Sequence, residues 1–200
     1  MIFDETLSWD KHINKCIGNA YGKFKQAYRF KHFLSNEAKL SISEIYILSQ
    51  FNYCDALFLN ASKLLKTKIQ KVQNNCIRFA LNLRKFDHIS AHRNSLGFLN
   101  MDNRRMLHSL TLMQKIVQKT APEYLRVRVH RHADIHEHNT RNRLAFTTDN
   151  NKTAKKASSF FGCIHKHYNT LCSNTDISNI SIDTFKLKCK KHLLVTGEPN

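Results

Sequence analysis

The chain has 200 residues, of which 42% are hydrophobic and 24% charged, enough for one ordinary domain or two small ones with a buried core. With only 5 Gly and 2 Pro, a collagen-like chain is excluded and a turn-rich all-β fold is disfavoured. Lys and Arg number 32 against 15 Asp and Glu, so the net charge is +17, which is typical of chains that bind a polyanion.

Three features of the sequence bear on membrane insertion and on the cellular compartment. The polyanion could be nucleic acid or an anionic membrane surface. No apolar run of about 18 residues is present, so we expect no membrane span. The first residues lack the cationic start and apolar segment of a secretory signal. The six Cys are widely spaced, which is typical of reduced thiols in an intracellular protein. A basic globular protein without any polyanion partner remains the alternative.

The first half of the chain predicts helices after a short strand. Ile2 and Phe3 precede a polar turn and are expected to be the remnant of an N-terminal strand. Residues 10–33 predict a long amphipathic helix, because their apolar residues recur at spacings of 4 and 3. Asn36 is a candidate cap for a second helix over residues 37–50.

Residues 62–83 show the clearest helical pattern. One apolar stripe, roughly 80° wide, is formed by Leu65, Ile69, Val72, Cys76, Ala80 and Leu83. Lys63, Lys71 and Arg78 project from the opposite side, and no acid occurs between Asp55 and Asp87. A merely solvated helix usually mixes charges of both signs, so this pattern predicts a basic face without neutralising acids.

The remaining elements complete a mostly α fold. We expect a connector at 84–101, a helix capped by Asp102 and stopped by Pro122, and a last helix over 184–194 capped by Asp183. Residues 123–160 are polar and basic, and are expected to be extended or loop-like. The predicted fold is an irregular multi-helix bundle with a short N-terminal strand remnant and a loop-rich basic segment.

Six stretches occur in the order of one known family. They are residues 3–13 (FDETLSWDKHI), 51–58 (FNYCDALF), 69–78 (IQKVQNNCIR), 120–125 (TAPEYL), 138–141 (HNTR) and 185–194 (FKLKCKKHLL). In this order they resemble the segment that follows the reverse transcriptase domain of jockey-like non-LTR retrotransposons. The resemblance covers nearly the whole chain.

The resemblance implies a fragment of an RNA-directed DNA polymerase. Residues 1–121 would be a helical, thumb-like region after the palm, and residues 122–200 a basic C-terminal extension. The family carries its catalytic Asp-Asp pair upstream, and this sequence contains no such pair. We therefore expect no catalytic residue, no cofactor and no activity from this chain alone. The Mg²⁺ ions would bind the missing palm domain, which is the implied partner, and the expected compartment is the nucleus.

The candidate ligand of this chain is the RNA or DNA backbone, because Lys and Arg donate to phosphates. The candidate residues are Lys63, Lys71, Arg78, Arg126, Arg128, Arg131, Arg141, Arg143, Lys186 and Lys190. The histidines among these arginines are His130, His132, His136 and His138. Because the neighbouring arginines oppose a cation, a phosphate-facing loop is favoured over a metal site there.

Two alternatives remain open. Cys163, His165, His167 and Cys172 are the best local candidates for a zinc-binding nucleic-acid module, although coincidence in a His-rich chain is the favoured interpretation. The other alternative is an inactive remnant of a retrotransposon reading frame. No nucleophile elbow, phosphate-binding glycine loop or dinucleotide-binding pattern is present in the sequence.

Overall fold

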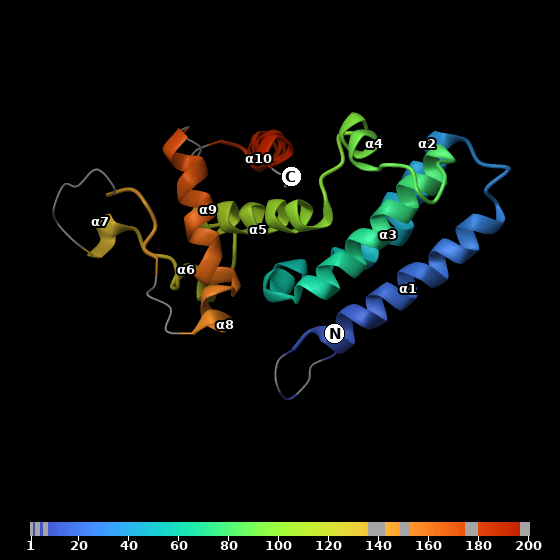
Figure 1. The fold of residues 1–200 in the computed structure, drawn as a ribbon. Helices are drawn as coiled ribbons and strands as arrows, with labels where there is room; N and C mark the ends of the chain where they lie inside the picture. Colours follow the sequence, from blue (N-terminus) through green and yellow to red (C-terminus); the bar gives the residue numbers. More distant parts are fainter. Residues whose placement is uncertain are drawn as a thin grey trace. The chain divides into compact units, whose positions relative to one another are not determined.

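The described part of the chain is mostly α-helical (Figure 1), which confirms the prediction of a mostly α fold. The computed structural model describes residues 2, 5, 8–135, 143–148, 153–174 and 180–196. None of these residues belongs to a strand, and an isolated antiparallel bridge joins Arg131 to Phe146. Of the expected strand remnant, Ile2 is not in a strand and Phe3 lies outside the described residues. No described helix combines the length and apolar character needed to cross a membrane.

The chain divides into two compact units, and the division falls inside a helix. An N-terminal unit extends to Arg105, and a C-terminal unit covers Met106–Thr196. The dividing helix is α5 (Met101–Val117).

The N-terminal unit is built on two long helices. These are α1 (Asp10–Arg29) and α3 (Lys63–Leu81), which lie side by side in Figure 1. Between them the chain forms α2 (Asn36–Ile42), a π turn η1 (Ser43–Ile47) and two 3-10 helices, η2 (Leu48–Phe51) and η3 (Asp55–Asn60). A short helix, α4 (Ser90–Ser95), follows α3. The helix predicted over residues 37–50 therefore forms as α2, η1 and η2 in succession.

The stripe predicted on α3 forms the core of this unit. Leu65, Ile69, Val72, Cys76 and Ala80 are all buried, together with Ile13, Ala20 and Ala27 of α1. Leu83, which was also predicted in the stripe, follows the end of α3 and is only half-buried. The two helices meet through the Phe24 and Phe79 rings, whose centroids are 5.6 Å apart. A buried amide, Gln73 Nε2, donates to the carbonyl oxygen of Leu99 at 2.8 Å and so ties α3 to the segment before α5.

Three helix caps differ from the prediction. Asn36 lies inside α2, and the Ser35 hydroxyl caps that helix by accepting the Ala38 N–H at 3.2 Å. Asn100 Oδ1, not Asp102, accepts the Asn103 N–H at 2.7 Å at the start of α5, and Asp102 instead pairs with Arg105 at 2.8 Å. The last helix, α10 (Ile182–Thr196), is capped by the hydroxyl of Ser181 rather than by Asp183. The assignments to Asp102 and Asp183 were wrong because each helix begins one residue before the acid, so its cap lies two residues before it.

Short helices replace part of the expected loop in the C-terminal unit. Within residues 123–160 the described helices are α6 (Glu123–Arg126), α7 (His132–Ile135) and α8 (Ala154–Ala157). They are followed by α9 (Phe160–Asn174), which sequence analysis did not predict. The buried rings of Tyr168 and Phe185 join α9 to α10, with centroids 5.9 Å apart. Gly162 allows α8 and α9 to approach, since a Cβ there would lie 2.2 Å from the Lys156 carbonyl oxygen.

Candidate nucleic-acid interface

The outer face of α3 carries exposed lysines without acids. Ser62 starts the helix by accepting the Leu65 N–H at 3.3 Å. At 100° per residue, Lys63 and Lys71 then lie on the side opposite the buried stripe, and Lys68 lies at the edge between the two sides. All three side chains are exposed, and none is paired with an acid within the described residues. These three lysines, here called the α3 basic face, are therefore available to an external anion.

Arg78 differs from the other two residues predicted on this face. Its side chain is half-buried, and its Nη2 donates to the carbonyl oxygen of Asp87 at 3.3 Å. The same turn is closed by Asp87 Oδ2, which accepts the Arg84 N–H at 2.6 Å. Arg78 thus supports the turn after α3, whereas Lys68, which sequence analysis did not select, is exposed beside Lys71.

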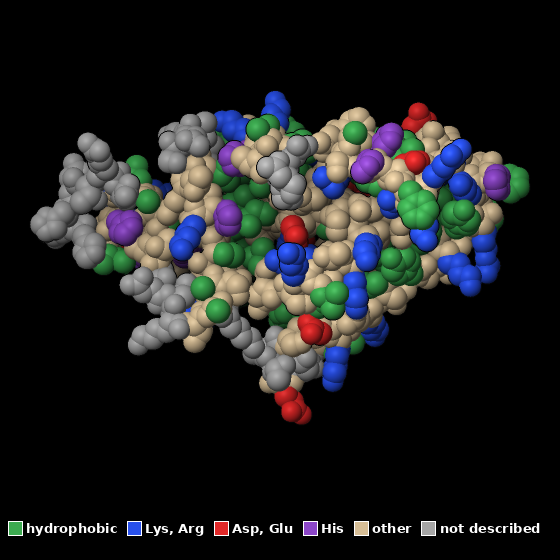
Figure 2. All heavy atoms as spheres, in the orientation of Figure 1, with side chains coloured by type: hydrophobic (Ala, Val, Ile, Leu, Met, Phe, Trp, Pro, Cys, Tyr) green, Lys and Arg blue, Asp and Glu red, His purple; other side chains and the backbone are tan. Residues whose placement is uncertain are grey.

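A second basic face lies on α1 and was missed by sequence analysis. Projected at 100° per residue, the exposed side chains of Lys11, Lys15, Lys25 and Arg29 fall within roughly 80° of one another, opposite the apolar stripe. The same projection that selected the α3 basic face would have found this α1 basic face. Figure 2 shows Lys and Arg spread over the region of α1 and α3 with few Asp or Glu.

Exposed aromatic side chains accompany the cations near the end of α1. Lys23 Nζ lies 4.5 Å from the centroid of the Tyr46 ring, and the Tyr46 hydroxyl donates to Gln26 Oε1 at 2.8 Å. Phe30 and Phe33 are 59% and 86% exposed. Aromatic rings between cations are typical of surfaces that stack unpaired bases. In contrast, Trp9 packs edge-on against Phe58, as expected for a core residue.

The predicted arginines of the C-terminal unit have different surroundings. Arg126 pairs with Glu123 at 3.8 Å, and the guanidinium groups of Arg128 and Arg131 lie over the rings of Phe161 and Phe146 at 5.8 and 5.1 Å. Arg143 is exposed. Arg141, His136 and His138 lie outside the described residues. On α10, Lys190 is exposed, and Lys186 pairs with Asp183 at 3.6 Å.

The Cys and His candidates for zinc are divided by α9. Cys163 and His167 are one helical turn apart on one side, whereas His165 and Cys172 lie two turns apart on the opposite side. A tetrahedral site needs all its ligands around one point. Within the described ranges, no group of three or more His, Cys, Asp or Glu is placed to hold a metal ion.

The buried thiols are kept protonated. Burial raises the pKa of Cys76 and of Cys189 to about 12. A nucleophilic or metal-binding cysteine needs a thiolate near neutral pH, and burial in apolar surroundings opposes its formation. These two cysteines therefore behave as small core residues.

Comparisons with protein-family models, with curated proteins and with solved structures found no match to this chain.

Proposed function

We propose that this chain is the non-catalytic C-terminal part of the reverse transcriptase of a non-LTR retrotransposon, and that it binds the phosphate backbone of RNA or DNA. The observation that carries the nucleic-acid part is the α3 basic face, where Lys63, Lys68 and Lys71 are exposed outside a buried stripe. The net charge of +17 and the α1 basic face support the same ligand.

The family assignment is supported by the six colinear sequence stretches. In the stretch at residues 69–78, the two glutamines that match the family's motif contact other parts of the chain. Gln73 bonds to the Leu99 carbonyl, and Gln70 Oε1 accepts the Met101 N–H at 2.9 Å. The motif would thus set the position of α3 against the start of α5, and the lysines on its outer face would meet the nucleic acid.

The proposed binding is electrostatic and independent of sequence. Each Lys that meets a phosphate releases a condensed counterion, so affinity should fall as the salt concentration rises. The lysine ammonium groups have no fixed planar geometry for reading base edges, and they would therefore position the chain on a strand without selecting a sequence. Polymerisation, in this proposal, belongs to the palm domain with its carboxylates and Mg²⁺, and the whole enzyme would work at chromosomal DNA in the nucleus.

The test is a binding titration of the full chain with labelled RNA and DNA of unrelated sequences, followed by fluorescence anisotropy. The Lys63→Ala, Lys68→Ala, Lys71→Ala triple variant should weaken binding to every sequence. The matched control replaces the same lysines with Arg and should bind like the wild type, because it keeps the charges. Equal affinity of the alanine and arginine variants would contradict the role of the α3 basic face.

A further inference from the structure

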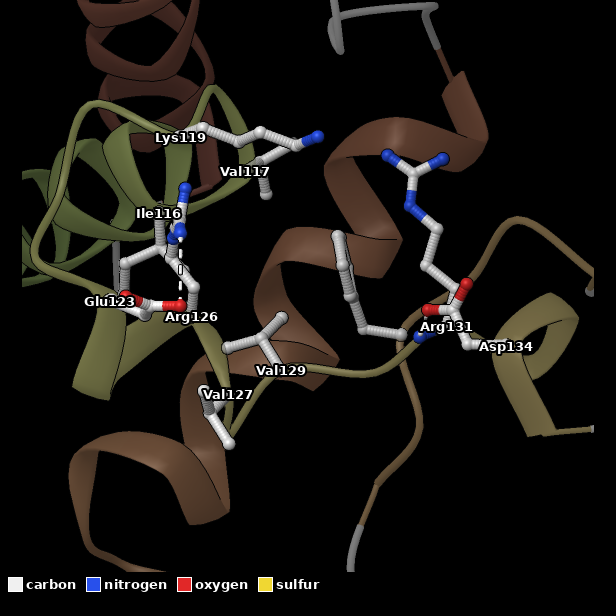
Figure 3. A pocket seen from close by; sticks show the side chains of 10 residues that line it. Ile116, Val117, Lys119, Glu123, Arg126, Val127, Val129, Arg131 and Asp134 are labelled. Atoms are coloured by element: carbon white, nitrogen blue, oxygen red, sulfur yellow. Dashed lines mark hydrogen bonds and ion pairs between the residues drawn. The ribbon is translucent and has the colours of Figure 1, made fainter.

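A cavity of about 510 Å³ opens in the C-terminal unit, between the end of α5 and the bridge at Arg131 (Figure 3). This volume lies within the usual range of small-ligand pockets, roughly 300–1,000 Å³. All of its lining residues belong to one unit. It is separate in sequence from the basic faces of α1 and α3.

The pocket combines apolar walls with a cationic side. Val127 and Val129 line one part of it, and the buried Ile116 and Phe146 side chains lie beneath. Lys119, Arg126 and Arg131 also line it, and Figure 3 shows the Lys119 side chain extending towards the wall that carries Arg131. Such a site fits a ligand with an anionic group and an apolar, planar part.

The acids of the pocket leave positive charge uncompensated. Glu123 is 3.8 Å from Arg126, and Asp134 Oδ2 accepts the backbone N–H of Arg131 at 2.7 Å, where it starts α7. No acid in the described part of the chain pairs with Lys119. Three cations therefore face two carboxylates, each of which already has a partner.

Lys119 also occupies a backbone position that disfavours it. Helix α5 ends at Val117, and Lys119 has a φ of 58°, in the left-handed region where Gly or Asn is preferred. Non-Gly residues at such backbone positions cluster at functional sites, which points to a use for this side chain. Here the use would be to bring an ammonium group to the pocket.

We infer that this pocket binds a nucleotide, with the phosphate between Lys119 and Arg131 and the base against Val127 and Val129. The inference rests on the proposed function, from which the choice of a nucleotide follows. The ligand is either a free nucleotide or the phosphorylated end of a nucleic-acid strand. The phosphate would gain charge-assisted hydrogen bonds from Lys119 and Arg131, and the base would cover the exposed Val127 and the half-buried Val129.

The test measures binding of AMP, adenosine and a short single-stranded oligonucleotide, with and without a 5′-phosphate, to the full chain. AMP should bind at least about tenfold more tightly than adenosine, and the phosphorylated oligonucleotide at least about tenfold more tightly than the oligonucleotide without phosphate. If AMP binds as tightly as the phosphorylated strand, the ligand is the free nucleotide. If the phosphorylated strand binds more tightly, the ligand is a strand end. No effect of the phosphate in either pair would overturn the inference.

Lys119→Gly separates binding from folding. It removes the ammonium and relieves the backbone, so phosphate-dependent binding should fall about tenfold while the melting temperature stays equal or rises. Lys119→Arg should retain binding, as should the control Lys115→Ala, which removes a cation one turn earlier on α5. Val129→Trp should also reduce binding by filling the pocket. Wild-type affinity in Lys119→Gly would overturn the inference, and duplex binding by that variant would show that the proposed function stands independently.

Discussion

The ammonium of Lys39 donates to Asn82 Oδ1 at 3.3 Å, joining α2 to the C-terminal cap of α3 across 43 residues of sequence. Lys39 is only 4% exposed, and Asn82 has a φ of 55°. The amide therefore provides both a residue that tolerates left-handed backbone and a partner for a buried cation, which also lies at the negative end of the α3 dipole. This contact fixes where α3, with its basic face, ends.

Replacing Asn82 should cost more than replacing Lys39. Asn82→Ala leaves the buried Lys39 ammonium without a partner. It also places Ala at a positive φ, which Ala tolerates less well than Asn. We therefore expect the free energy of unfolding to fall by about 2–4 kcal/mol. Lys39→Met removes the need for the partner and should cost about 1 kcal/mol or less. Urea denaturation followed by fluorescence of Trp9, the only Trp of the chain, measures both. Equal losses would show that the pair does not act as described.

Substitution by Asp should destabilise the chain strongly on the buried face of α3 and hardly at all on the exposed face. Ile69 is 1% exposed, so Ile69→Asp places an unpaired charge in the core and should destabilise the N-terminal unit by about 3–5 kcal/mol. Lys71→Asp is on the exposed side and should change the free energy of unfolding by less than about 0.5 kcal/mol. The melting curves of the two variants decide this. A large loss for Lys71→Asp would place its side chain in the core.

The buried thiol of Cys76 predicts a loss of stability at alkaline pH. Its pKa is raised to about 12 by burial, whereas a thiol in the unfolded chain ionises near pH 8.5. Below about pH 8 both states keep the proton; above it the unfolded state loses the proton first, so the free energy of unfolding falls as pH rises. By pH 10 the loss should be about 2 kcal/mol.

The thiol contribution is isolated by its own variant. Cys76→Ala lacks the titrating group, so its stability should fall less between pH 8 and pH 10 than that of the wild type, whatever its stability at pH 7. Urea titrations at three pH values give the slope of the free energy of unfolding against pH for the wild type and for the variant. Parallel slopes would mean that the Cys76 thiol ionises alike in the folded and unfolded chain.

The part of the chain that the sequence predicted best is the part with one strong period. Ile69 and Val72 repeat at helical spacing over 62–83, so the stripe, the helix and the exposure of Lys71 all follow from local pattern. Helix α9 could have been predicted in the same way, because Phe161, Ile164, Tyr168 and Leu171 recur at spacings of 3, 4 and 3. Tyr168 donates from its hydroxyl to the buried Gln114 of α5, a contact between distant segments that no local pattern predicts.

The site residues divide in the same way. The exposure of Lys63 follows from the helical period, but the contact of Arg78 with Asp87 depends on how the chain turns after α3. The pocket around Lys119 could not be predicted, since it is built from a helix end and a bridge between residues 131 and 146.

The chain alone should not extend a primer. Two-metal polymerisation needs clustered carboxylates, and the sequence contains no Asp-Asp pair. We expect no nucleotide incorporation on a primed RNA template with Mg²⁺ or Mn²⁺, in preparations cleared of contaminating polymerase. Incorporation above a heat-inactivated control would show that the chain contains a catalytic centre.

The most direct test of backbone binding is the salt dependence of affinity for duplex nucleic acid. The slope of log affinity against log salt concentration should be clearly negative in the wild type, since each phosphate contact contributes roughly 0.9. The Lys63→Ala, Lys68→Ala, Lys71→Ala variant should keep its melting temperature and flatten the slope by about 2–3. An unchanged slope in the folded variant would move the contact away from α3. A wild-type affinity that does not depend on salt would contradict nucleic-acid backbone binding itself.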